Sequence, residues 1–355
     1  MADLLVDLTS LYKRKITGVE IYGIEFYKAL LKTKHRIIPI FRIENTIDDN
    51  PNSIIIPYSN RIIVENYSIP RIIRKSNADV IFFPVFPPPI TVYNSRIKII
   101  PTIHDLAFKY YFKTLSWKAK IYLIPKYNKA LQKSNKIITI SETVRNQLEN
   151  VSSVEIINLG NNISDQYKTE CYSYNIATLD KFNLENGKYI ISVSTIEPRK
   201  NLIYLFKIWE QLDKEFERYK LVLTGRYGWG NDKDLDTYIL KFRDSIIFTG
   251  YVSQKELIDL YHFSGSFVLL SHYEGFGRTP LEAYSCGANV IVSDIPIFRE
   301  NMNKLAVTFV TLDSLSTAIN TIRKSIIEKK KNNILPDSYY NVLDKTIAEN
   351  INNII

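Results

Sequence analysis

The feature that most restricts how this chain of 355 residues folds is a regular alternation of short apolar runs with amphipathic stretches. Runs such as IISVS and VIVSD are almost wholly apolar, which is typical of parallel strands buried on both faces. We therefore expect strands at 4–8, 35–41, 79–85, 98–103, 136–140, 155–159, 189–194, 220–224, 246–250, 266–270, 289–293 and 306–310. Amphipathic segments such as 19–31 and 115–131 fit the helices that connect them.

A polar, irregular stretch at 161–188 divides this alternation into two similar halves. Strand and helix alternating twice over predict an α/β protein with two doubly wound, Rossmann-like domains that face an interdomain cleft. We expect an N-terminal domain at 1–165, a C-terminal domain at 166–335, and a helix at 336–355 that returns to the N-terminal domain. Ligands of such sheets bind beyond the carboxyl ends of the strands, so the residues after each strand are the candidates for function.

Cysteine content and the N-terminal segment bear on the compartment. Two cysteines, Cys171 and Cys286, are too few for a disulfide framework or a zinc site of standard spacing, which fits a reducing compartment. Charged residues interrupt the apolar positions of the first 16 residues, and no apolar run is long enough to cross a bilayer. We expect a cytoplasmic protein, either free or held at the inner face of the cytoplasmic membrane.

The formal net charge of +9 is concentrated in one segment. Between Leu106 and Ser141 there is no acidic residue, and aromatic residues alternate with lysines 109, 113, 118, 120, 126, 129, 133 and 136. Ammonium groups and aromatic rings suit the interface of an anionic membrane, so 108–136 is a candidate membrane surface. The alternative is a solvated helix with an aromatic inner face. The segment has no recognisable motif for reading nucleic acid, and we expect no nucleic-acid partner.

The first candidate binding motif follows the strand expected at 189–194. Its sequence EPRKN places Arg199 and Lys200 directly before a helix that starts near Asn201. A helix N-terminus favours anions, arginine offers a planar fork to phosphate oxygens, and lysine adds a point charge. This arrangement predicts a diphosphate site, and the alternative is an exposed turn that is basic by chance.

The second candidate motif, YEGFGRTPLEA, follows the strand expected at 266–270. Its glycines allow close approach of the backbone to a ligand, and Pro280 suits the first turn of the next helix. Glu274 at the strand end is placed to accept hydroxyls of a hexose, and Glu282 within the helix to accept those of a ribose. The alternative for Glu282 is an acid that complements the helix dipole.

The EPRKN stretch and the two glutamates seven residues apart resemble the signature of the retaining glycosyltransferases of family 4. That resemblance covers essentially the whole chain and implies the GT-B fold, in which the N-terminal domain, 1–165, binds the acceptor and the C-terminal domain, 166–335, holds most of the nucleotide-sugar. It also implies that the donor is a substrate and that neither a cofactor nor a metal is required. The donor-binding residues that it implies are Gly18, Arg199, Lys200, Gly225, Tyr251, Val252, Phe276, Gly277, Arg278, Thr279 and Glu282.

The resemblance implies catalytic positions as well. Glu274 would contact the donor sugar near the reacting carbon, and His104 with Asp105 matches the family's pair at the acceptor side. His104 would contact the transferred sugar or orient the acceptor hydroxyl, although a lone histidine at a strand end is often structural. Ser141 resembles the family's serine-led helix start and is equally explained as an N-cap.

Two features depart from the family or point away from chemistry. Arg278 stands where the family more often has an aliphatic residue, and a cation there would assist phosphate binding or select an acceptor. Asp234-Leu235-Asp236 satisfies an Asp-x-Asp pattern but follows no strand, so we expect no metal there.

These observations predict a retaining hexosyltransferase that acts on a glycan or a lipid-linked oligosaccharide. GDP-mannose is the first choice of donor, by similarity to bacterial polysaccharide and O-antigen mannosyltransferases, and a UDP-hexose or a deoxysugar donor is the alternative. A GT-B sugar-nucleotide epimerase and a sugar-binding subunit without catalysis are the rival functions. Transfer to an acceptor distinguishes the enzyme from both.

Overall fold

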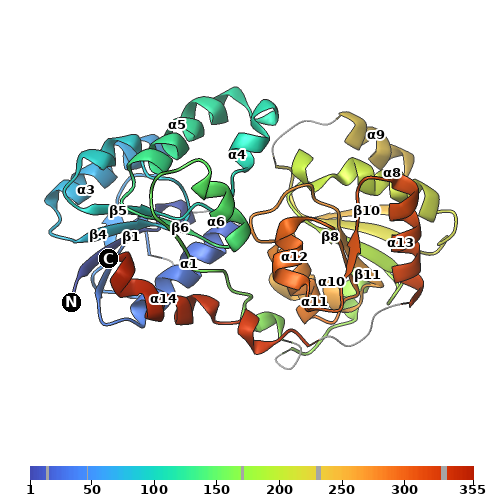
Figure 1. Cartoon of the computed structure of the whole chain (residues 1–355). Coiled ribbons are helices and arrows are strands. Elements are labelled where there is room, and N and C mark those ends of the chain that lie inside the picture. The colour runs from blue at the N-terminus through green and yellow to red at the C-terminus, as the bar shows by residue number, and fades with distance from the viewer. Residues whose placement is uncertain (13–15, 46, 169–171, 229–232, 329–333) are drawn as a thin grey trace. The chain divides into compact units, whose positions relative to one another are not determined.

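The structure is a computed structural model that describes residues 1–12, 16–45, 47–168, 172–228, 233–328 and 334–355, with the backbone alone at 233–236. Cys171 therefore lies outside the described residues, as do the side chains of Asp234 and Asp236. The chain forms two compact units, one made of 1–110, 117–162 and 341–355 and the other of 111–116 and 163–340 (Figure 1).

Unit 1 is built on a five-stranded parallel sheet in the order β3-β2-β1-β4-β5. The strands are β1 (Asp3–Asp7), β2 (Arg36–Arg42), β3 (Ile54–Ile56), β4 (Val80–Phe83) and β5 (Lys98–Pro101), and β6 (Ile137–Thr139) pairs with β7 (Ile156–Asn158) beside them. Its helices are α1 (Gly18–Leu31), α2 (Arg61–Ile63), α3 (Ile69–Lys75), α4 (Ala107–Tyr110), α5 (Trp117–Lys133), α6 (Glu142–Glu149) and α14 (Val342–Ile354).

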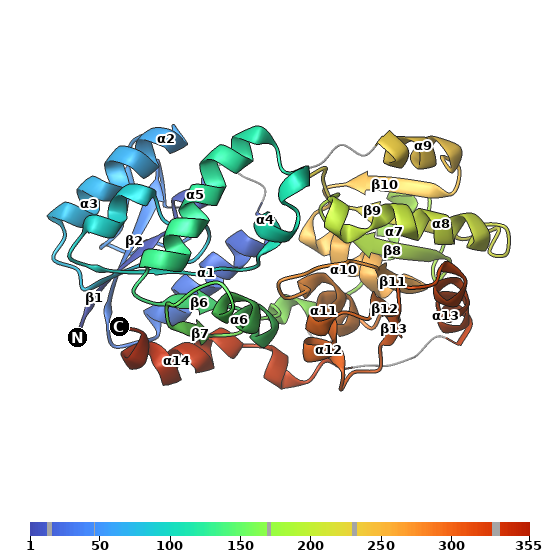
Figure 2. The same cartoon turned by 45° about the horizontal axis from the view of Figure 1, so that its top comes forward.

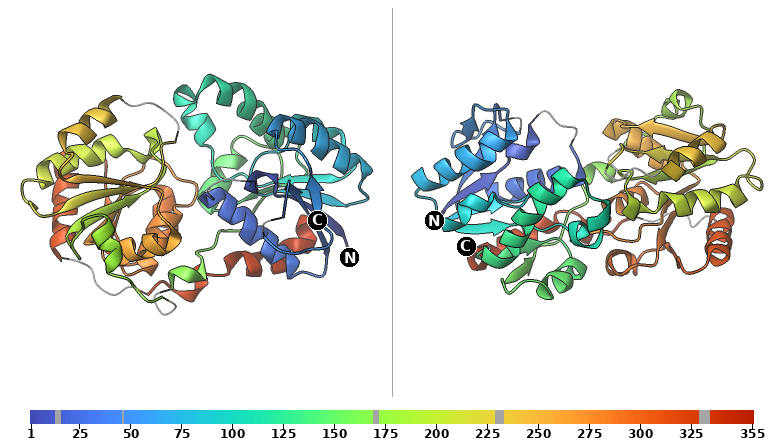
Figure 3. Two further views of the ribbon diagram at one scale, coloured as in Figure 1. Left: turned by 180° about the vertical axis from the view of Figure 1, so that it is seen from behind. Right: turned by 90° about the horizontal axis from the view of Figure 1, so that it is seen from above.

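Helices cover both faces of the unit 1 sheet, as the apolar strands require. Helices α3 and α5 lie over one face, and α1 with α14 lies over the other (Figures 1 and 2). The C-terminal helix α14 packs against α1 and is tied to the preceding chain by Leu343 N, which donates to Asn162 Oδ1 at 2.8 Å. Both ends of the chain thus belong to unit 1 (Figure 3).

Unit 2 is built on a six-stranded parallel sheet in the order β10-β9-β8-β11-β12-β13. The strands are β8 (Tyr189–Val193), β9 (Lys220–Thr224), β10 (Ile246–Gly250), β11 (Ser266–Leu269), β12 (Val290–Ser293) and β13 (Thr308–Val310). The helices are α7 (Ala177–Lys181), α8 (Leu202–Leu212), α9 (Lys233–Lys241), α10 (Gln254–His262), α11 (Arg278–Ser285), α12 (Pro296–Met302) and α13 (Leu315–Glu328).

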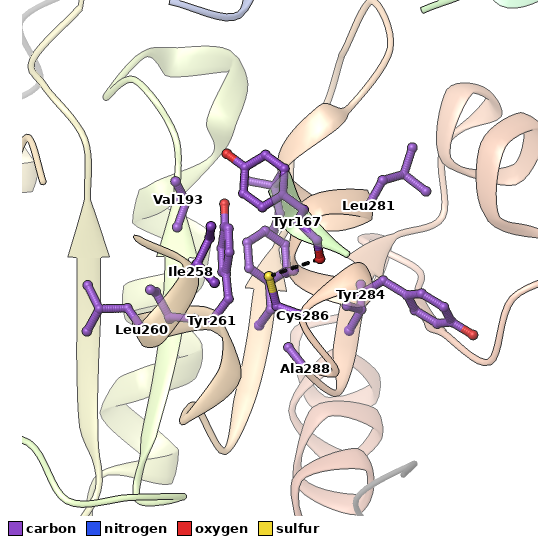
Figure 4. Close-up of a cluster of buried hydrophobic side chains, with 14 of the residues drawn as sticks. Tyr167, Val193, Ile258, Leu260, Tyr261, Leu281, Tyr284, Cys286 and Ala288 are labelled. Atoms are coloured by element: carbon purple, nitrogen blue, oxygen red, sulfur yellow. Dashed lines mark hydrogen bonds between the residues drawn. The ribbon is translucent and has the colours of Figure 1, made fainter. Parts of the chain in front are cut away.

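Two apolar cores fill the two faces of the unit 2 sheet. One core packs α8 and α13 against the sheet around Phe206 and Trp209, and the other packs α10, α11 and α12 around Tyr261 and Phe298. In the second core, the rings of Tyr167 and Tyr261 lie beside Cys286 under α11 (Figure 4). Cys286 is fully buried and burial raises the pKa of its thiol, so it is a packing residue, as expected from the small residues that follow it.

The α/β, doubly wound architecture is confirmed in both units. All twelve expected strands are present, and each end lies within two residues of its expected position. One strand was missed. The three isoleucines of β3 are too short a run to distinguish an edge strand from a loop on sequence alone.

Candidate functional site

The sheet order of unit 2 fixes where a ligand site is expected. From β8 the chain runs outward through β9 and β10 on one side, and it then returns to β11, which pairs with β8 on the other side. The crevice at such a reversal, outside the carboxyl ends of the two central strands, is where open α/β sheets bind ligands. The two sequence motifs follow these two strands, β8 and β11.

Arg199 and Lys200 lie on a 3₁₀ turn, Pro198–Lys200, between β8 and α8. Asn201 ends this turn in the left-handed conformation with φ of 56°, which reverses the chain so that α8 can begin at Leu202. Asparagine tolerates this region better than most residues do. The turn aims both cationic side chains at the loop that follows β11, as their contacts show.

Glu274 is the partner of both cations. Its carboxylate accepts from Lys200 Nζ at 2.6 Å, from Arg199 Nη1 at 2.9 Å and from Ser271 Oγ at 2.8 Å. The other side of Arg199 is bound by Glu197, whose Oε2 accepts from Nε at 2.8 Å. Glu197 and Ser271 were not expected as site residues, although Glu197 stands in the first motif and Ser271 lies two residues before the second.

The protonation states of this cluster follow from its burial and its charges. Burial alone would raise the pKa of Glu274, but Lys200 and Arg199 outweigh it and hold the pKa at about 2. Burial and the neighbouring Arg199 lower the pKa of Lys200, and the Glu274 carboxylate opposes that shift. The carboxylates of Glu197 and Glu274 thus balance the two cations that the sequence assigned to phosphate.

The loop between β11 and α11 needs its glycines. Gly277 has φ of +79°, and a Cβ there would stand 2.5 Å from Cε1 of Phe298. The preceding carbonyl, that of Phe276, accepts from Asn301 Nδ2 at 2.7 Å, which fixes the loop on α12. The next residue, Arg278, begins α11, so the amides of the first helical turn lie at the end of this loop.

Glu282 lies one turn further along α11 and is 5% exposed. Arg278 Nε lies 3.5 Å from its Oε1, so the residue that departs from the family pattern is paired with the proposed ribose carboxylate. Thr279, the residue after Arg278, is half-buried. Pro280 occupies the first turn of α11, as expected. Arg278 thereby offsets a buried negative charge that would otherwise be costly.

The remaining donor-binding candidates of unit 2 behave differently from one another. Gly225, just after β9, has φ of +142°, and a Cβ would stand 2.0 Å from the carbonyl oxygen of Ser194, so only glycine allows the two strand ends to meet. Tyr251, after β10, is 52% exposed. Val252 is 8% exposed and its side chain packs in the apolar core, so it contributes to packing rather than to a binding surface.

In unit 1, Gly18 is the first residue of α1, and the preceding Thr17 amide donates to Glu20 at 2.9 Å, which caps the helix. His104 follows β5 and its Nε2 lies 2.8 Å from the carbonyl oxygen of Pro84. A carbonyl only accepts, so Nε2 carries the proton, and burial lowers the pKa of the ring and keeps it neutral. The Nδ1 lone pair is thus the group of His104 that can accept a proton from a hydroxyl.

Two other candidates of unit 1 have local structural roles. Asp105 Oδ1 accepts from the amide of Ala107 at 2.9 Å, which stabilises the turn into α4. Ser141 Oγ accepts from the amide of Val144 at 3.2 Å, so this serine is the N-cap of α6. Both bonds are short-range and hold backbone rather than a ligand.

The basic segment is divided between surface and core. Trp117 and Ile121 of α5 are 68% and 69% exposed. Lys126, however, is buried and forms an ion pair with Glu65, so its inclusion in a one-sided cationic surface was wrong. The hydroxyl of Tyr122 donates to the same carboxylate. Among the helices of the described residues, none combines the length and apolarity needed to cross a membrane.

Comparison with known proteins agrees with this geometry. Residues 16–164 match the model of Glycosyltransferase Family 4, and residues 177–334 match that of Glycosyl transferases group 1. HepE from Anabaena, solved with UDP-glucose, superposes with a TM-score of 0.73 at 14% identity over 99% of this chain and 100% of that one. The lipopolysaccharide glycosyltransferase WaaG superposes with a TM-score of 0.69 at 12% identity over 99% and 95% of the two chains.

Two curated relatives share more sequence. O-antigen chain mannosyltransferase B of Escherichia coli is 29% identical over 57% of this chain and 55% of its own length. O-antigen chain mannosyltransferase RfbU of Salmonella typhimurium is 29% identical over 56% and 53%. The match thus spans about half the length of these relatives.

Two Rossmann-like units, with a cationic turn and a glycine loop at the carboxyl ends of the second sheet, define a glycosyltransferase of the GT-B class. The chain belongs to glycosyltransferase family 4, with its C-terminal half formed by the group 1 glycosyltransferase domain.

Proposed function

We propose that this protein transfers a hexosyl group, with retention of configuration, from a nucleotide diphosphate sugar to a hydroxyl of a glycan acceptor. The observation that carries the proposal is the buried cluster of Arg199, Lys200 and Glu274 at the reversal point of the unit 2 sheet. In this proposal the two cations bind the diphosphate and the ionised carboxylate contacts the sugar, at the carboxyl ends of β8 and β11.

The reaction requires a leaving group with a stabilised charge. The bond between the anomeric carbon and the phosphate oxygen breaks, and its electron pair stays on the diphosphate, where Arg199, Lys200 and the amides of the first turn of α11 stabilise it. The acceptor oxygen then bonds to the same face of the anomeric carbon, and its proton passes to the leaving phosphate. This route needs no enzymic nucleophile and no metal, since the cations are side chains.

GDP-mannose is the proposed donor, because the two curated relatives are named O-antigen mannosyltransferases. A UDP-hexose is the second candidate, because HepE, which shares only the fold, is solved with UDP-glucose. The acceptor is proposed to be a glycan or a lipid-linked oligosaccharide. The exposed Trp117 and Ile121 support a peripheral contact of α5 with an anionic membrane.

The donor assignment is tested by calorimetry with GDP, UDP, GDP-mannose and UDP-glucose. Lys200→Ala removes one charge-assisted contact and is expected to weaken donor binding about ten- to hundredfold. Lys207→Ala, on the exposed side of α8, is the matched control and should bind as the wild type does. Unchanged affinity in Lys200→Ala would refute the diphosphate assignment.

The reaction type is tested with a radiolabelled donor and an oligosaccharide acceptor, with and without EDTA. Labelled acceptor bearing the donor's own anomeric configuration, formed equally with EDTA, is the expected result. An epimerised donor without transfer would identify an epimerase instead. Donor binding without turnover on any acceptor would identify a sugar-binding subunit.

A further inference from the structure

At the amino ends of its strands, unit 1 has a hollow of about 980 Å³, which we call the amino-edge hollow. The amides of Asp79 and Lys98 donate to the carbonyl oxygens of Asp3 and Asp79, each at 3.0 Å, so the starts of β1, β4 and β5 lie side by side there. The loops before β2, β4 and β5 and the end of α14 line the hollow. This edge of the sheet is opposite the carboxyl ends of the strands, where open α/β sheets bind their usual ligands.

Positively charged side chains surround the amino-edge hollow. Among the described residues that line it, Asp79 supplies a carboxylate and the cations come from Lys34, Arg74, Arg96 and Lys98. Asp79 Oδ2 accepts from the amide of Asp3 at 2.9 Å, and the carboxylate of Asp3 is paired with Arg36 at 3.3 Å. The end groups at Met1 and Ile355, which also line the hollow, have opposite charges and offset each other. The side chains therefore leave an excess of positive charge.

Within the described chain, no Asp or Glu side chain forms an ion pair with these cations. Arg74 Nε donates to the carbonyl oxygen of Pro70 at 3.3 Å, and Lys98 Nζ donates to the main-chain oxygen of Ile355. Lys34 and Arg96 are exposed, and no hydrogen bond or ion pair joins either side chain to another described residue. Like charges gathered in one place repel one another, and an anion bound among them relieves that repulsion.

The floor of the amino-edge hollow is apolar. Ile73, Ala78 and Ile97 line it and are 2%, 5% and 8% exposed. Walls of low dielectric constant focus the field of like charges into a cleft, so these cations attract an anion more strongly than cations scattered over a convex surface do. The combination of shape and charge distinguishes this site from a solvated basic face.

The wall of the hollow also contains an unpaired hydrogen-bond donor. The amide of Ala2 donates to His35 Nδ1 at 3.2 Å, and burial lowers the pKa of the His35 ring, so the neutral imidazole carries its proton on Nε2. This Nε2 is buried and has no hydrogen-bond partner among the described residues. A buried donor without a partner costs free energy, and an anion beside His35 would offset part of that cost.

The spacing of the cations indicates the size of the ligand. In the sheet order β2-β1-β4-β5, three steps of about 4.8 Å give a span of about 14 Å. Lys34 precedes β2 and Arg96 precedes β5, so cations stand at both ends of this span. A single phosphate cannot reach both ends, whereas a molecule with two or more phosphate groups can.

We propose that the amino-edge hollow binds a phosphorylated small molecule with at least two phosphate groups, through Lys34, Arg74 and Arg96. Guanidinium forks match phosphate oxygens, and the lysine adds a point charge. The hollow is at the opposite edge of the sheet from the carboxyl strand ends, so its ligand is neither the donor nor the acceptor of the proposed transfer. The inference therefore goes beyond that function. A phosphorylated lipid headgroup shares this chemistry, and the test separates the two sources.

The test uses inorganic triphosphate and the full chain, with calorimetry for affinity and hydrogen–deuterium exchange for location. Triphosphate should slow exchange in the loops 76–79 and 94–98 of the wild type. Arg74→Gln combined with Arg96→Gln should weaken this binding at least about tenfold, because each substitution removes a charge-assisted contact. Lys200→Ala, which removes a cation of unit 2, should leave the protection of both loops unchanged.

Matched controls separate binding from folding and from net charge. Lys28→Gln combined with Lys75→Gln removes the same charge at exposed positions of α1 and α3 that do not line the hollow, and this variant should bind triphosphate as the wild type does. The Arg74 and Arg96 double variant breaks no ion pair with an Asp or Glu side chain of the described chain, so its Tm should equal that of the wild type. Lost binding then cannot be ascribed to unfolding.

Flotation with vesicles that contain phosphatidic acid distinguishes a lipid headgroup from a free molecule. The Arg74 and Arg96 double variant should float to the same extent as the wild type. Reduced flotation of that variant, with no protection of the loops by triphosphate, would place a lipid headgroup in the hollow and overturn the proposal of a free molecule. The proposal also fails if triphosphate protects neither loop, if it protects them equally in the double variant, or if Lys200→Ala alone abolishes the protection.

Discussion

Lys200 Nζ lies 2.6 Å from Glu274 Oε1, and neither side chain exposes more than a tenth of its surface. The two residues come from loops 74 positions apart in the sequence, and the reversal of the unit 2 sheet brings them together. Removing one member of a buried ion pair leaves the other charge without compensation. The resulting loss in free energy of unfolding is far larger than the stabilisation that an exposed ion pair provides. The same contact therefore holds the loops after β8 and β11 together.

Glu274→Gln is expected to destabilise the protein by about 3 kcal/mol at pH 7, because Lys200 and Arg199 lose their shared carboxylate. The folded pKa of Glu274, at about 2, is below its ordinary 4.5, so its stabilisation is present above pH 4.5 and is lost as the pH falls toward 2. Urea denaturation should show that the difference in free energy of unfolding between variant and wild type becomes smaller as the pH falls over that range. Glu217→Gln, at an exposed position, is the control, and a gap independent of pH would contradict the assignment.

Gly277→Ala is expected to impair donor binding, and Gly287→Ala is its matched control. Both glycines have positive φ, of +79° and +84°, so both variants pay a similar backbone strain of about 1 kcal/mol. Only at Gly277 does the new Cβ meet a neighbour, the ring of Phe298, while nothing lies within 4 Å at Gly287. Calorimetry should therefore show weaker nucleotide binding for Gly277→Ala alone, and equal losses in both variants would argue against a role of this loop in binding the donor.

The positions of these site residues were predictable, but their contacts were not. Buried parallel strands have continuous apolar runs, so the end of β8, and with it Arg199 and Lys200, could be placed from sequence. That Glu274 neutralises both cations depends on the order of strands in the sheet, which no local pattern encodes. The pairing of Arg278 with Glu282 was in principle visible, since residues four apart on a helix face each other.

The contacts of unit 1 were harder to predict from the sequence for the same physical reason. Asp7, Arg42 and Arg61 share no motif and line one pocket only because the ends of β1 and β2 and the start of α2 converge there. Lys126 was misassigned in a different way. The sequence grouped it with the surface lysines of the basic segment, although it is buried and paired with Glu65. Sequence periodicity indicates which face of a helix is apolar, and it does not reveal a buried charge whose partner comes from another helix.

Membrane contact through α5 is tested by flotation with vesicles of phosphatidylglycerol and phosphatidylethanolamine at low salt. Trp117 and Ile121 are exposed and one helical turn apart, so both lie on one face. Replacing both with glutamate should abolish flotation, because an apolar anchor becomes two anionic groups facing an anionic surface.

The control for charge alone is the pair Asn128→Glu and Gln132→Glu, which adds the same charge at exposed polar positions of α5. This variant should bind less tightly than the wild type and still float. Wild-type protein that stays with the soluble fraction, or equal loss in both double variants, would refute an aromatic anchor at Trp117.

Asp7→Asn is expected to stabilise the protein at neutral pH, because burial disfavours the ionised form of the Asp7 carboxylate. Burial raises the folded pKa of Asp7 to about 6 from its ordinary 3.8. Between these values the folded state holds more protons than the unfolded state, so stability falls as the pH rises from about 4 to about 6. Asparagine cannot ionise and keeps an oxygen for Thr9, so the variant should exceed the wild type by up to about 3 kcal/mol at pH 7 and match it near pH 4. Urea denaturation at both pH values, with the exposed Asp49→Asn as control, measures the difference, and a gap that did not change with pH would show that Asp7 titrates normally.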